Sequence, residues 1–84
     1  MALELPTLCS LIVGVKPSLA NHEWSLDDRL TDLGLDSLDI LQLGRRLQRK
    51  AGVPFVIGDW IENRPKDVPL TLGELFDAAR ASEG

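Results

Sequence analysis

The apolar residues of this chain recur at intervals of three and four, the spacing that places side chains on one face of an α-helix. The N-terminal segment shows the pattern at Leu5, Leu8, Ile12 and Val15. An alternating pattern of the kind that indicates a β-strand extends beyond four residues only around Val53–Ile57. The periodicity therefore predicts an all-α fold.

Helix start and stop signals predict four helices. The second helix has Asp36 as its N-cap with Asp39 three residues later, and the fourth begins with a Thr71–Glu74 capping box. We expect helices over residues 4–15, 37–51 and 59–63, the last capped by Asp59, and a fourth from Thr71. The predicted fold is a small four-helix bundle with three main helices, one short third helix and a long first loop. With 84 residues, the chain is expected to be one domain, 1–84.

The long first loop, residues 16–36, is too apolar to be free. Loops of this length in a compact domain are functional or carry small structure of their own. Ser25 and Asp28 form a capping pair that favours a short helical turn. The apolar side chains of the loop are expected to hold it against the helices: Trp24, Leu26, Leu30, Leu33 and Leu35.

Composition excludes several classes of protein. The single cysteine, Cys9, cannot form an internal disulfide and favours a reducing, cytoplasmic compartment. One Cys and one His rule out an ordinary structural zinc site, so no metal is expected. The longest apolar stretch, Leu11–Val15, is too short to cross a bilayer. A net charge of −4 makes nucleic acid a poor partner. We therefore expect neither membrane nor nucleic-acid binding.

Ser37 is the residue of greatest chemical interest. It follows the predicted cap Asp36, where first-turn N–H groups are unpaired and the helix dipole favours a phosphate. A serine at a helix start is often only a capping residue. No His or Lys lies near it in sequence to act as a base, so a hydrolase nucleophile is disfavoured and no catalytic residue is predicted. From the residues alone, a cap and a phosphate-bearing residue both remain open.

The run Asp32-Leu33-Gly34-Leu35-Asp36-Ser37-Leu38 resembles the attachment site of acyl carrier proteins, and the helix order extends that resemblance over nearly the whole chain. The resemblance implies that a phosphopantetheinyl transferase attaches 4'-phosphopantetheine from coenzyme A to Ser37. The thiol of that arm would hold acyl groups as thioesters. The chain would perform no catalysis itself. It would be a monomer serving acyl-loading, condensing and acyl-transfer enzymes of fatty-acid, polyketide or specialised lipid synthesis.

The resemblance also places partner docking on the second helix. The expected docking residues are Asp36, Leu38, Asp39, Leu41, Arg45, Arg46 and Arg49. This helix departs from a typical fatty-acid carrier, whose second helix is acidic throughout, because its C-terminal end is basic. Either these cations suit the helix dipole, or they select a dedicated set of partners.

Two other functions and one local feature remain open. The chain resembles peptidyl or aryl carriers of nonribosomal peptide systems less closely, and a non-carrier helical interaction module is a third interpretation. Gly44 lies inside the second helix, where glycine costs about 1 kcal/mol relative to alanine. It either permits close approach of a partner, the first helix or an acyl chain, or is simply tolerated.

Overall fold

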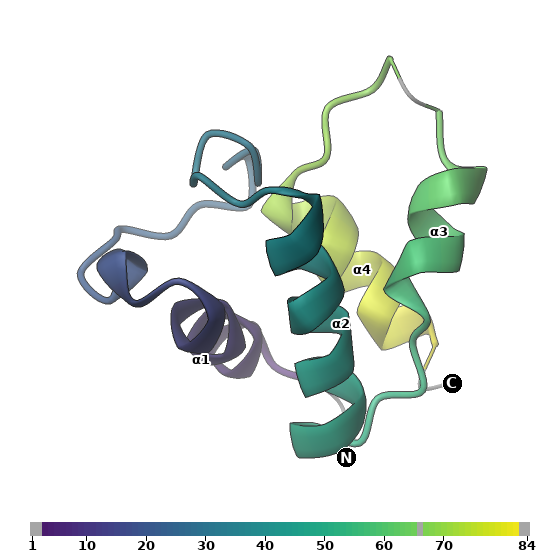
Figure 1. The fold of residues 1–84 in the computed structure, drawn as a ribbon, viewed down its shortest axis with the longest axis horizontal. Coiled ribbons are helices and arrows are strands. Elements are labelled where there is room, and N and C mark those ends of the chain that lie inside the picture. Colours follow the sequence, from purple (N-terminus) through teal and green to yellow (C-terminus); the bar gives the residue numbers. More distant parts are fainter. Residues whose placement is uncertain (1–2, 66, 83–84) are drawn as a thin grey trace.

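The computed structural model describes residues 3–65 and 67–82. Its helices are α1 (Leu5–Val15), α2 (Ser37–Lys50), α3 (Ile57–Asn63) and α4 (Leu72–Ala81), with a 3₁₀ turn, η1 (Pro17–Leu19), after α1. Figure 1 shows α2 between α1 and α3, with α4 behind it. Over the described ranges the only β-type pairing is one isolated bridge, so the all-α prediction is confirmed.

The core lies where the inner faces of the helices meet. Leu8 and Ile12 of α1, Leu43 and Leu47 of α2, and Leu75 of α4 are fully buried. Burying each such side chain contributes about 1.5–3 kcal/mol. The outer face of α2 remains exposed. Among the described helices, none is both long enough and apolar enough to cross a membrane.

The first loop is held in place by the start of α4. The Leu72 N–H donates to the Asp28 carbonyl at 2.8 Å, and the Gly73 N–H donates to the Leu26 carbonyl at 2.9 Å. These N–H groups belong to the first turn of α4 and have no acceptor within that helix. The loop carbonyls therefore accept hydrogen bonds from the unpaired N–H groups at the start of α4. In return, α4 fixes the path of the loop toward α2.

Two predictions for this loop need correction. Leu26 is 50% exposed, and it docks on the start of α4 through its backbone carbonyl. Ser25 and Asp28 form a hydrogen-bonded turn and no helix. The helical turn of the connection lies earlier, at η1. The other apolar predictions hold, since Leu30, Leu33 and Leu35 are buried and Trp24 packs against the core.

The third helix begins earlier than predicted. Val56 is its N-cap, without a side-chain cap, and Asp59 lies within its first turn. The reason is tertiary packing, because Ile57 is buried in contact with α2 and the helix begins at this residue. Trp60 and Ile61 are half-buried against the core.

Gly44 permits that contact between α2 and α3. A Cβ atom built on Gly44 would lie 2.3 Å from Ile57 Cγ2, a distance that real Cβ atoms essentially never show. The sequence suggested that a partner, the first helix or an acyl chain approaches Gly44, whereas the segment that approaches it is α3.

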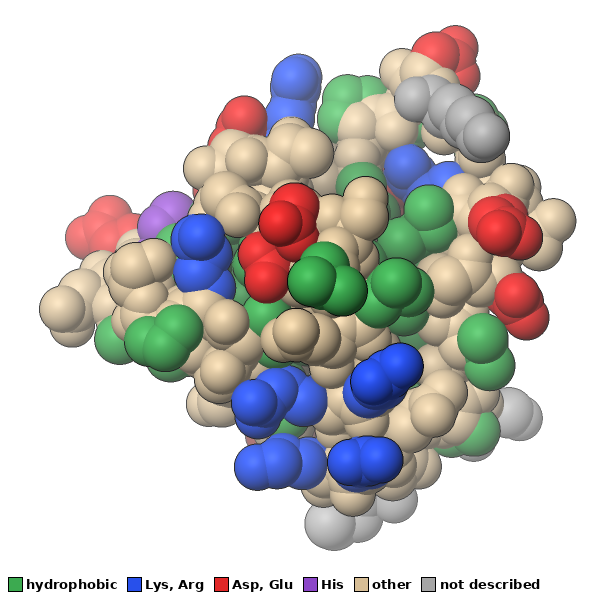
Figure 2. Space-filling model, viewed as in Figure 1, with side chains coloured by type: hydrophobic (Ala, Val, Ile, Leu, Met, Phe, Trp, Pro, Cys, Tyr) green, Lys and Arg blue, Asp and Glu red, His purple; other side chains and the backbone are tan. Residues whose placement is uncertain are grey.

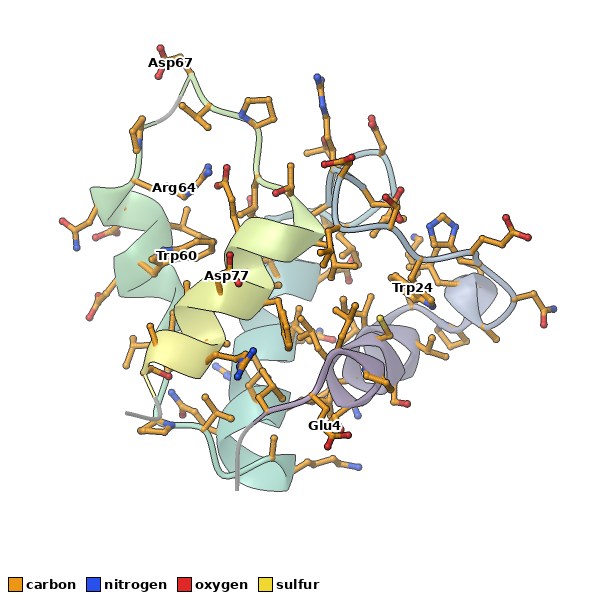
Figure 3. All side chains as sticks on the ribbon, turned by 180° about the vertical axis from the view of Figure 1, so that it is seen from behind. Glu4, Trp24, Trp60, Arg64, Asp67 and Asp77 are labelled. Atoms are coloured by element: carbon orange, nitrogen blue, oxygen red, sulfur yellow. The ribbon has the colours of Figure 1, made fainter. Side chains whose placement is uncertain are left out.

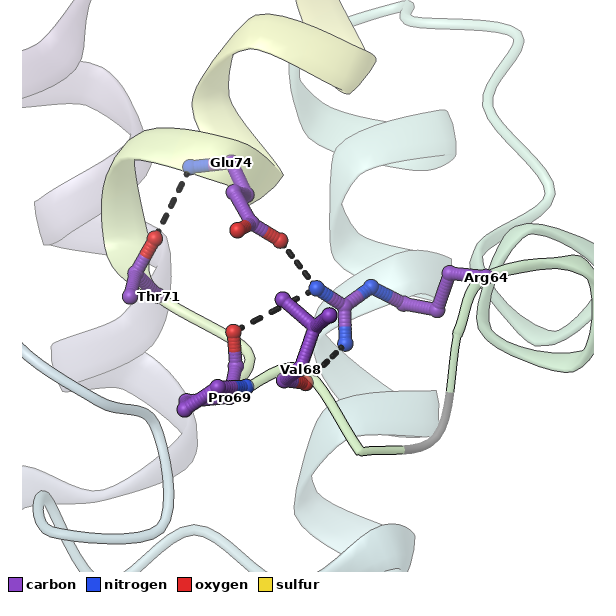
Figure 4. A network of polar contacts seen from close by, with 5 residues as sticks. All are labelled: Arg64, Val68, Pro69, Thr71 and Glu74. Carbon is purple, nitrogen blue, oxygen red and sulfur yellow. Dashed lines mark hydrogen bonds and ion pairs between the residues drawn. The ribbon is translucent and has the colours of Figure 1, made fainter.

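Arg64 connects the end of α3 to the start of α4 (Figure 4). Its guanidinium donates to the carbonyls of Val68 at 2.9 Å and Pro69 at 3.3 Å, and it forms an ion pair with Glu74. Thr71 caps α4 by accepting from the Glu74 N–H, as predicted, but the Glu74 carboxylate is directed to Arg64. Figure 3 shows Arg64 and Trp60 reaching from α3 toward α4.

Candidate functional site

Ser37 is the first residue of α2, and its side chain is exposed. The capping role belongs to its neighbour. Asp36 accepts a hydrogen bond from the Asp39 N–H at 2.8 Å, and Asp39 accepts one from the Asp36 N–H at 3.3 Å. This capping box confirms the predicted helix start. Within the described part of the chain the Ser37 hydroxyl makes no hydrogen bond. Ser37 is therefore free of the structural role that most helix-start serines perform.

The turn before Ser37 is fixed from below by two leucines. Leu33 and Leu35 are buried, and the Leu35 N–H donates to the Leu30 carbonyl at 3.1 Å. Gly34 between them has φ of +83°, a conformation that glycine adopts without strain. Leu38, on the other side of Ser37, does not anchor the turn. Its side chain is 64% exposed because it lies on the outer face of α2.

Lys16 approaches this turn from the end of α1. A Cβ atom built on Gly34 would lie 2.9 Å from Lys16 Cε and 3.3 Å from its Nζ. The lysine stem therefore packs over the glycine and brings a positive charge to the turn. No local sequence pattern predicts this contact, since Lys16 and Gly34 are far apart in the chain.

The predicted docking residues all lie on α2 or at its cap. Asp36, Leu38, Leu41, Arg45 and Arg49 are exposed, whereas Asp39 and Arg46 are half-buried. Figure 2 shows acidic, then apolar, then basic side chains following one another down the centre of this face. The inner stripe of the same helix, Ile40, Leu43 and Leu47, is buried. The structure thus places these residues along the one helix that begins at Ser37.

His22, the single histidine, is engaged within the first loop. Its Nε2 lies 2.9 Å from an Asp28 carboxylate oxygen, which also accepts the Ser25 N–H at 2.9 Å. The hydrogen bond from His22, followed by that from Ser25, lowers the pKa of Asp28. The His22 ring packs edge-on against Trp24 with centroids 5.0 Å apart. Among the described residues His22 makes no hydrogen bond to Ser37, so it is not placed to act as a base for that hydroxyl.

Cys9, the single thiol, is buried in α1, where it packs as a small apolar core residue. Burial raises the pKa of its thiol, with a smaller contribution from the charge on Asp28. The thiol is therefore a weak nucleophile in the folded protein.

The start of α2 meets the chemical requirements for a phosphate bonded to Ser37. The first-turn N–H groups of Ser37 and Leu38 have no acceptor within the helix. The positive end of the helix dipole favours an anion at this position. The fold and the free hydroxyl together define a small helical domain suited to carry a phosphate-linked group.

Comparison with known families agrees with this site. The family model described as "Phosphopantetheine attachment site" matches residues 5–64. The chain belongs to this family, which attaches a 4'-phosphopantetheine prosthetic group. Searches of curated proteins and of solved structures returned no match.

Proposed function

We propose that this chain is an acyl carrier protein and that Ser37 carries its phosphopantetheine arm. The observation that carries the proposal is the exposed Ser37 hydroxyl, which has no hydrogen-bond partner in the described structure because Asp36 performs the capping. A serine with no structural role, at a helix start that favours phosphate, suits attachment better than it suits capping.

The attachment reaction uses this chain only as a nucleophile. The Ser37 oxygen forms a bond to the pantetheine-bearing phosphorus of coenzyme A, and the bond from that phosphorus to the nucleotide breaks. The nucleotide leaves as 3',5'-ADP, and the hydroxyl proton passes to a base of the transferase. The N–H groups of the first turn stabilise the attached phosphate. When bound, the arm supplies a thiol that holds an acyl group as a thioester.

Chemistry on the cargo would then belong to separate enzymes. We propose that the chain is one carrier domain that catalyses no reaction itself. Asp36 would help the transferase dock, and the exposed Leu38 and Leu41 would contact acyl-loading and condensing enzymes. Exposed leucines next to the attachment residue provide the apolar contact that such transient complexes need.

Intact-mass spectrometry tests the proposal. The purified chain, incubated with coenzyme A and a broad-specificity phosphopantetheinyl transferase, should gain one phosphopantetheine mass. Ser37→Ala should abolish the gain, whereas Ser18→Ala, at another exposed serine, should not. An adduct that persists in Ser37→Ala would overturn the assignment of the residue. No adduct on the folded wild-type chain, with a known carrier modified in the same reaction, would overturn the carrier function.

The cargo class requires a second experiment. The phosphopantetheine-modified chain is incubated with acyl-, aryl- and aminoacyl-loading enzymes, and the mass of each product is measured. We expect acyl transfer to dominate, since the motif Leu33-Gly34-Leu35-Asp36-Ser37-Leu38 favours acyl over peptidyl carriers. Dominant aryl or aminoacyl transfer would instead identify a carrier of nonribosomal peptide synthesis.

A further inference from the structure

The last two turns of α2 carry a concentrated positive charge. The basic end of α2 is defined by Arg45, Arg46, Arg49 and Lys50. Together with Gln42, these residues line a shallow hollow of about 420 Å³. The Arg46 guanidinium lies over α1 at Gly14, where a Cβ atom would come within 3.0 Å of Arg46 Nη1. The hollow therefore has one cation fixed against α1 and three that project into solvent.

Nothing in the described part of the chain neutralises these cations. None of the four makes a side-chain hydrogen bond or ion pair there, since the two ion pairs join His22 to Asp28 and Arg64 to Glu74. Attraction to the helix dipole is confined to the last turn, and accounts for Arg49 and Lys50. It does not account for Arg45 and Arg46, which lie a turn earlier. These positive charges are available to a partner.

The basic end is electrically separate from the acidic end of the same helix. With a rise of 1.5 Å per residue, Arg45 lies about 9 Å from Asp39 along the axis, and Arg49 about 15 Å. The Debye length at physiological ionic strength is about 8 Å, so a partner senses the two ends as distinct charges. The exposed leucines Leu38 and Leu41 lie between them and make the surface continuous.

Resting on the proposed carrier function, we propose that the basic end of α2 selects partner enzymes with an acidic patch on the docking surface that faces it. Arginine forks pair well with carboxylates, and the partner side chains would enter the hollow. The same cations repel a docking surface that is basic along its whole length. A protein partner is favoured over an anionic membrane because the basic end continues into exposed leucines, and the chain as a whole has a net charge of −4.

The test uses two versions of one enzyme as probes. The first is a type II fatty-acid ketosynthase whose carrier-docking patch is uniformly basic. The second has the basic residues that face the C-terminal end of the carrier helix replaced by Glu. The chain is loaded on Ser37 with a pantetheine that bears a cysteine-directed electrophile, and crosslinking rates to the ketosynthase are measured. Loading is verified by mass first, so a failure to load concerns the proposed function and not this inference.

The wild-type chain should crosslink to the Glu-substituted ketosynthase about tenfold or more faster than to the uniformly basic ketosynthase. This magnitude is the effect of a surface charge pair summed over the three arginines. The triple variant Arg45→Glu, Arg46→Glu, Arg49→Glu should reverse this preference. Both preferences should weaken as salt is raised. Equal rates of wild type and triple variant on both probes would overturn the proposal.

Arg80→Glu supplies a matched control. Arg80 is an exposed arginine in the last turn of α4, so this change alters net charge and helix-dipole interaction as Arg49→Glu does. Arg49→Glu should shift the preference between the two probes, and Arg80→Glu should not. An equal shift from both would mean that net charge alone acts, and would overturn the proposal. Cosedimentation of the wild-type chain with phosphatidylglycerol vesicles, lost in the triple variant, would assign the cluster to membranes and also overturn it.

Discussion

Replacing Gly44 by alanine should destabilise the protein, although alanine is the better helix former. The helix gains about 1 kcal/mol from the change. The new Cβ atom, however, would lie 2.3 Å from Ile57 Cγ2 and 3.1 Å from Ile57 Cβ. Forcing a methyl group into a packed interface typically costs 1–3 kcal/mol, and a contact this short belongs at about the upper end. The net expected loss is about 1–2 kcal/mol, which corresponds to about 4–16 °C in Tm for a domain of this size.

Two further variants isolate the cause of that loss. Gly58→Ala is the matched control, because its Cβ would meet Leu41 Cδ2 at an ordinary 3.7 Å. It should be neutral or stabilising by up to about 1 kcal/mol. Ile57→Leu removes the offending Cγ2 while conserving volume, at a cost below about 1.5 kcal/mol. In that background the Gly44→Ala penalty should fall by about 1 kcal/mol or more.

Urea denaturation of the four proteins and of the double variant measures these terms, with circular dichroism to verify helix content. The coupling energy between positions 44 and 57 is the decisive quantity. If Gly44→Ala were as stable as wild type, with no coupling to Ile57→Leu, then α2 and α3 would move apart to admit the methyl group with no loss of stability. Gly44 would then not be required for the contact between α2 and α3.

Three further predictions concern Gly34, Asp28 and Cys9. Gly34→Ala should cost about 1–2 kcal/mol because of the positive φ, with Lys16 displaced as well, and urea denaturation should show Gly34→Asn to be milder. Asp28 has a lowered pKa in the fold, so its contact with His22 stabilises the protein fully above the ordinary Asp pKa of about 4. This stabilisation is lost as the pH falls through the lower pKa of the folded state. The Tm difference between wild type and Asp28→Asn should therefore shrink below about pH 4. Buried Cys9 should react with a disulfide reagent far more slowly in the native apo chain than in the urea-unfolded chain. Equal labelling rates in the native and unfolded chains would contradict its burial.

The parts of the structure that sequence predicts well are those determined by neighbouring residues. The start of α2 follows from the Asp36–Asp39 capping box, and its end follows from Gly52, which has φ of +67°. The exposed and buried stripes of α2 follow from helical periodicity, which separates Leu38 and Leu41 from the buried Leu43 and Leu47. Local chemistry determines these features, and a sequence contains it directly.

The features that sequence did not predict depend on contacts between distant segments. The earlier start of α3 depends on Ile57 packing against Gly44, and the position of the turn before Ser37 depends on Lys16. Arg64 bridging to Glu74 belongs to the same class. A periodic pattern shows which face of a helix is buried but not which helix covers it. The free state of the Ser37 hydroxyl also needed the structure, since from the residues alone Ser37 and Asp36 were both possible caps.

The residues of α2 that hold the fold are buried, and those proposed to contact partners are exposed, so effects on function can be separated from effects on stability. Truncating the buried Leu43 or Leu47 to alanine should cost about 2–5 kcal/mol. Exchanging the exposed Arg45 or Arg49, which have no partners in the described structure, should change stability by no more than about 0.5 kcal/mol. Ser37 belongs with the second group, because its hydroxyl satisfies no backbone group. Ser37→Ala should therefore unfold at the wild-type urea concentration, so that loss of the phosphopantetheine adduct in that variant reports on the missing nucleophile and not on a damaged fold.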